Sequence, residues 1–91
     1  MVPRDINGIK LEHDFEPTVK TLVRILKIMT EKGPEVKTSL SLDANLQYGR
    51  LAKHIVWLEK KGLVESTIDK SKINVGLTEK GRIFASVFLD D

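Results

Sequence analysis

The segment at residues 57–81 reads WLEKKGLVESTIDKSKINVGLTEKG and connects the expected end of one helix to the expected start of another. Gly62 can end the first helix, because helix C-termini favour a glycine in the left-handed conformation. The β-branched stretches LVESTI and INVGL then flank the polar tetrapeptide DKSK at 69–72. This pattern is typical of two strands joined by a tight loop. Thr78 suits the N-cap of a final helix near 78–89, so the segment predicts helix, β-hairpin, helix.

Three helices are expected before this hairpin. Apolar residues at helical spacing between Val19 and Met29 predict a first helix near 17–32, with Pro17 in its first turn and KGP after its last one. A second, shorter helix is expected near 36–44, where Asn45 interrupts it. A third is expected near 47–61, and its narrow core-facing stripe consists of Leu51, Ile55 and Leu58.

The N-terminal residues show a different period. In GIKLEHDF at 8–15, apolar and charged residues alternate, which predicts a short strand containing Ile9 and Leu11. Residues 1–16 are therefore expected to form a strand or arm, and residues 17–91 a domain. A chain of 91 residues suits one modest core.

Composition excludes several classes of site. The chain has no cysteine, which rules out disulfides and thiolate metal sites, and its two histidines make a poor metal site. Catalytic motifs and glycine-rich phosphate loops are missing, so neither an enzyme nor a cofactor is expected. The N-terminus lacks a signal pattern and no apolar run reaches the roughly 18 residues of a membrane span, which predicts a cytoplasmic protein.

Positive charge is concentrated in one part of the chain. Residues 1–46 carry seven basic and seven acidic side chains, whereas residues 47–72 carry six basic and three acidic ones. The excess therefore lies on the third helix and the hairpin, an asymmetry that attracts polyanions, although a solvated lysine-rich face would look the same.

A short helix, a tight turn and another helix form a helix-turn-helix arrangement. The stretches LAKHIVWLEKKGLVE and VGLTEKG resemble archaeal winged-helix regulators and their MarR-like and PadR-like relatives, and DANLQYGRLAKHI resembles small archaeal winged-helix DNA-binding proteins. The resemblance covers about residues 18–89. It implies an α+β, mainly α, winged helix-turn-helix fold: a three-helix core, a two-stranded wing and a C-terminal helix.

The same resemblance implies a DNA-binding transcriptional regulator whose partner is double-stranded DNA. The helix near 47–61 would enter the major groove, and the hairpin tip near 69–72 would meet the adjacent backbone or minor groove. Gln47 stands where such proteins often have Ser or Thr; it caps poorly but can read a base edge. The candidate DNA contacts are Gln47, Tyr48, Gly49, Arg50, Lys53, His54, Lys70, Ser71 and Lys72.

Two alternatives and one further expectation accompany this hypothesis. The fold could serve as a protein–protein interaction module, or the chain could be a chromatin protein with little sequence preference. A homodimer is also expected, although the same apolar residues could all belong to the monomer's own core, which the final helix would help to build. The candidate dimer contacts are Ile9, Leu11, Ile83, Phe84, Val87 and Phe88.

Overall fold

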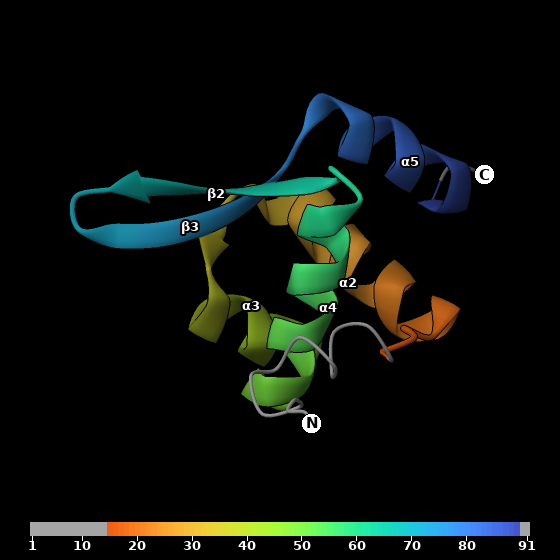
Figure 1. The fold of residues 1–91 in the computed structure, drawn as a ribbon, viewed down its shortest axis with the longest axis horizontal. Coiled ribbons are helices and arrows are strands. Elements are labelled where there is room, and N and C mark those ends of the chain that lie inside the picture. The colour runs from red at the N-terminus through yellow and green to blue at the C-terminus, as the bar shows by residue number, and fades with distance from the viewer. Residues whose placement is uncertain (1–14, 90–91) are drawn as a thin grey trace, which may run out of the picture.

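The computed structural model describes residues 15–89. Its elements follow the predicted order of helices and hairpin, with one extra strand. They are α2 (Val19–Lys32), β1 (Glu35–Val36), α3 (Lys37–Ala44), α4 (Tyr48–Lys60), β2 (Val64–Asp69), β3 (Lys72–Leu77) and α5 (Glu79–Leu89). Figure 1 shows the β2–β3 hairpin projecting to one side of the helices, while α5 lies on the opposite side. The strand expected at 8–15 falls outside the described residues except for Phe15, which is in neither a helix nor a strand.

Helix α2 begins at Val19, slightly later than the start near residue 17 that the sequence predicted. The Thr18 hydroxyl accepts a hydrogen bond from the backbone N–H of Thr21 at 3.3 Å, so Thr18 is the N-cap. Pro17 therefore precedes the cap rather than sitting in the first helical turn. The helix ends at Gly33, whose φ of 80° lies in the region that favours glycine.

Strand β1 was not predicted, because two residues are too few to show a period. It pairs antiparallel with β3 through Glu35 opposite Val75 and Val36 opposite Asn74. The sheet therefore has three strands in the order β1-β3-β2, with β3 in the middle. This pairing ties the start of α3 to the root of the hairpin.

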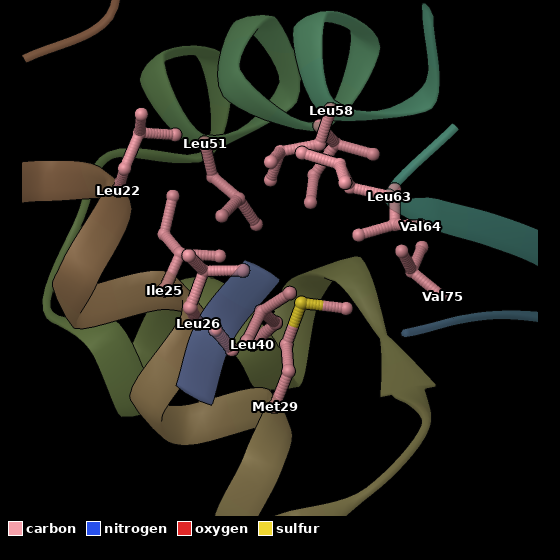
Figure 2. Packing of buried hydrophobic residues seen from close by; sticks show 12 residues of the cluster. Leu22, Ile25, Leu26, Met29, Leu40, Leu51, Leu58, Leu63, Val64 and Val75 are labelled. Carbon is pink, nitrogen blue, oxygen red and sulfur yellow. The ribbon is translucent and has the colours of Figure 1, made fainter. Parts of the chain in front are cut away.

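The core lies where α2, α3 and α4 meet the hairpin root. The predicted stripe of α4 is confirmed, since Leu51, Ile55 and Leu58 are all fully buried. Figure 2 shows Leu51 and Leu58 pointing toward the side chains of α2, with Val64 and Val75 closing the end of the core near the hairpin. Burying this apolar surface fixes α4 along one face and leaves its other face to solvent.

Helix α5 packs through its small residues. Gly81 and Ala85 are buried, whereas Ile83, Val87 and Phe88 have exposed fractions of 63%, 75% and 41%. Some of the four residues Ile83, Phe84, Val87 and Phe88 were expected to be buried, and of these only Phe84 is half-buried against the core. A helix that approaches its neighbour through glycine and alanine comes too close for large side chains on the same face.

Candidate nucleic-acid interface

The exposed surface of α4 begins at its N-terminus. Gln47 precedes the helix with extended backbone angles and makes no side-chain cap hydrogen bond, as its residue type predicted. The helix has no acidic residue in its first turn. The residues predicted to contact DNA at this end of the helix are all exposed: Gln47, Tyr48, Gly49, Arg50 and Lys53.

His54 lies on the opposite, inward face. Its side chain is 2% exposed and its Nδ1–H donates to the Arg50 carbonyl oxygen at 2.8 Å. The Phe15 ring packs edge to face against it, with ring centroids 4.9 Å apart. Burial lowers the pKa of His54. The hydrogen bond to the Arg50 carbonyl opposes this shift with a smaller effect, and the Arg50 charge adds a still smaller lowering. The ring is therefore neutral at pH 7.

The prediction that the His54 ring contacts DNA is wrong, because α4 keeps it inside the protein. The sequence did contain a signal for this outcome. His54 follows Leu51 by three residues and precedes Leu58 by four, so helical spacing places it in the same buried stripe. Its hydrogen bond to the Arg50 carbonyl supports the helix backbone directly beneath an exposed candidate contact.

The hairpin ends in a two-residue turn. Lys70 and Ser71 have φ angles of 52° and 69°, which is the left-handed pair that a tight turn between two antiparallel strands requires. Asp69 stands opposite Lys72 as the last strand pair. All four residues are exposed, so the predicted loop at the hairpin tip is confirmed.

The hairpin is held against α4 near its root. The Ser66 hydroxyl donates to the Glu59 carboxylate at 2.7 Å, which joins strand β2 to the last turns of α4. Trp57 packs partly buried against the core, and the Lys61 ammonium lies 5.4 Å from the centre of its ring. The Ser66–Glu59 hydrogen bond therefore links the helix to the hairpin near the hairpin root.

Two further properties restrict the chemistry of this surface. Within the part of the chain that the structure describes, no group of three or more His, Cys, Asp and Glu side chains could hold a metal ion. None of the described helices is long and apolar enough to cross a membrane.

Comparison with known proteins gives a family and several structural relatives. The family model described as winged helix-turn-helix matches residues 18–88. A MarR family protein from Bacillus stearothermophilus has a TM-score of 0.73 at 20% identity, covering 91% of this chain and 59% of its own. A MarR family transcriptional regulator from Silicibacter pomeroyi has a TM-score of 0.70 at 21% identity, covering 88% and 53%.

A third similar structure is that of BpsR from Bordetella bronchiseptica, described as a study of how 6-hydroxynicotinic acid regulates its DNA binding. It has a TM-score of 0.71 at 17% identity and covers 76% of this chain and 51% of its own. No curated protein matches the sequence. The chain thus spans between 51% and 59% of the length of these three structures, and at such identities the likeness is one of fold.

Proposed function

The chain belongs to the winged helix-turn-helix family, and we propose that it is a DNA-binding transcriptional regulator of the cytoplasm. The observation that carries the proposal is the exposed N-terminal half of α4. Within residues 15–89, no acidic side chain forms an ion pair with Arg50 or Lys53. A helix with exposed cations at its N-terminal half and its other face anchored in a core suits the major groove, which is wide enough to admit one α-helix.

Each candidate contact at the start of α4 has a proposed role. Arg50 and Gln47 can donate to base edges, Lys53 can pair with a phosphate, and the Tyr48 hydroxyl can bond to the backbone. Gly49 has no packing reason to be a glycine, since a Cβ at this position would meet nothing within 4 Å. Its missing side chain leaves room for a DNA strand to approach the helix.

The hairpin tip is the second proposed contact. Helix α4 is joined to the root of the hairpin, and Lys70 and Lys72 are exposed at its tip. With α4 in the major groove, these two lysines would lie beside the phosphates that border the groove. Ser71 at the turn can donate to a phosphate oxygen. Contacts of this kind position a protein on DNA without reading its sequence.

The direct test is a gel-shift titration of the purified protein against random DNA and against fragments selected from genomic DNA, repeated over a salt series. A regulator binds a subset of fragments at least about a thousandfold more tightly than random DNA. Equal affinity for all fragments would favour the chromatin protein. Absence of binding at low salt would overturn both DNA hypotheses and favour the protein-interaction module.

One observation keeps the protein-interaction module as the second candidate. Ile68 and Ile73 stand opposite each other near the hairpin tip and are 78% and 54% exposed. Apolar pairs in that position could pack against another protein. They could also strengthen the hairpin itself through cross-strand contact.

We expect the double substitution of Lys70 and Lys72 by alanine to weaken binding to specific and random DNA together. Each lost phosphate contact lowers the magnitude of the slope of log K against log[salt] by about 0.9, so the pair should lower it by one to two units. Exposed charges contribute little to stability, and the melting temperature should hardly change. A folded double variant with the wild-type slope would show that the hairpin does not touch DNA.

We also propose that the regulator is a homodimer, with α5 as part of the interface. Ile83, Val87 and Phe88 form an exposed apolar surface on this helix, while Ile9 and Leu11 lie outside the described residues. Two-fold pairing would place two α4 helices about 34 Å apart on one face of DNA.

The expected result of light scattering at micromolar concentration is twice the 10.3 kDa mass of one chain. Substitution of Ile83 and Val87 by glutamate should halve the measured mass without unfolding the monomer, because both side chains are exposed in the single chain. A wild-type protein that is monomeric both free and on DNA would contradict the dimer.

A further inference from the structure

A cationic cleft lies beside the proposed DNA-binding helix. It has a volume of about 520 Å³ and separates the N-terminal half of α2 from the turn between α3 and α4. Its walls include Lys20 and Arg24 of α2, Asn45 and Gln47 of the turn, and Arg50 of α4. The cleft therefore joins residues that are far apart in the sequence.

The charge of this cleft is of one sign. Lys20, Arg24 and Arg50 line it, and none of its described lining residues is acidic. The first turns of α2 and α4 also carry no Asp or Glu that could neutralise these cations. Three cations around one cleft create a local positive potential that favours an anion.

Arg24 is held in place at the edge of the cleft. Its Nη1 donates to the carbonyl oxygen of Ala44, the last residue of α3, at 3.3 Å. The guanidinium has five N–H donors, so this bond leaves others for a second acceptor. Lys20 lies one helical turn before Arg24 on α2, and both side chains are exposed.

The cleft is continuous with the surface already assigned to DNA. Gln47 and Arg50 line it and also line a second cleft of about 440 Å³, to which Lys53 contributes on the far side together with the acidic Glu16. Arg50 thus stands between the two. A duplex with α4 in its major groove has a phosphate strand on either side of that helix, and the α2 side is where Lys20 and Arg24 lie.

We propose that Lys20 and Arg24 seat the DNA sugar-phosphate backbone that borders the major groove, as a second anchor opposite the hairpin. This inference rests on the proposed function. The ligand of Lys20 and Arg24 is a backbone phosphate and not a base, because these two residues belong to α2, which lies beside the helix that enters the groove. The two cations set the position of α4 on the duplex and do not read its sequence.

The test compares one double variant and two single variants of exposed α2 cations. In K20Q/R24Q, affinity should fall by about tenfold for each lost contact near 0.1 M salt, equally on preferred and random DNA, and the salt slope should decrease by one to two units. The matched control is Lys27→Gln, which removes an exposed charge of the same helix that does not line the cleft. It should bind like the wild type.

Ethylation of individual phosphates locates the contact. Phosphates whose ethylation blocks the wild type but no longer affects K20Q/R24Q should flank the groove on the side away from the hairpin. Lys20→Gln alone should show half of the change in slope. Because this variant loses no hydrogen bond within the described residues, it separates the loss of a phosphate contact from a structural effect of removing the Arg24–Ala44 hydrogen bond.

The outcomes separate this inference from the function on which it rests. If the wild type binds DNA and K20Q/R24Q matches Lys27→Gln in affinity and slope, the cleft does not hold phosphate and the proposed function stands. If the wild type does not bind DNA, both fail. If affinity falls on preferred DNA alone, these residues read sequence and the backbone assignment is wrong.

Discussion

Gly81→Ala is expected to destabilise the domain by more than about 3 kcal/mol, which is a large share of the stability of a small protein. A Cβ placed on Gly81 would overlap the backbone carbonyl oxygen of Leu63 and lie 3.2 Å from a methyl group of Leu77. The Leu63 carbonyl cannot withdraw, because it accepts the Thr78 backbone N–H at 3.0 Å. Relief would require α5 to move away from the hairpin root.

The surrounding hydrogen bonds oppose that movement. The Thr78 hydroxyl accepts the Gly81 N–H at 2.9 Å and donates to the Gly62 carbonyl at 2.7 Å, so one side chain holds both the start of α5 and the end of α4. Urea denaturation followed by helical circular dichroism would measure the loss. A variant with the wild-type midpoint would show that α5 does not dock as described.

Gly49→Ala is the matched control, since both glycines lie in helices. A Cβ at Gly49 meets nothing within 4 Å, and alanine favours a helix over glycine. This variant should therefore gain about 0.5 to 1 kcal/mol in the free energy of unfolding. If DNA approaches the helix at this point, the same variant should bind DNA less tightly while being more stable.

The sequence predicted those parts of the fold that depend on patterns among neighbouring residues. The hairpin followed from β-branched stretches around a polar loop, and the α4 stripe followed from helical spacing, because that helix buries one face. Strand β1 was missed because two residues carry no pattern. The buried face of α5 could not be predicted, because Gly81 and Ala85, which make the contact, are small beside the large apolar residues of the same helix.

The candidate site shows the same division. Exposed residues of α4 and of the hairpin tip could be named because charge and position coincide in the sequence. Lys20 and Arg24 lie in a segment whose basic and acidic residues balance, so composition gave no reason to single them out. Only the packing of α2 beside the turn brings them next to Arg50.

Arg50→Ala is expected to cost about 1 to 3 kcal/mol of binding free energy on the preferred DNA site and much less on random DNA. The reason is geometric. Arg50 is the third residue of α4, its backbone is held by His54, and within the described residues no ion pair occupies its guanidinium. A guanidinium at the start of a recognition helix can donate two parallel hydrogen bonds to guanine O6 and N7.

Two companion variants decide what Arg50 contacts. Arg50→Lys keeps the charge and loses the planar pair of donors, so it should behave like alanine on the preferred site if guanine is read, and like the wild type if a phosphate is bound. Lys53→Ala removes a nearby exposed cation of the same helix and should weaken both DNAs equally, as phosphate contacts do. If Arg50→Ala loses equal binding affinity on both DNAs, Arg50 contacts the DNA backbone. If it loses no affinity on either DNA while its helical circular dichroism is unchanged, α4 is not part of the interface.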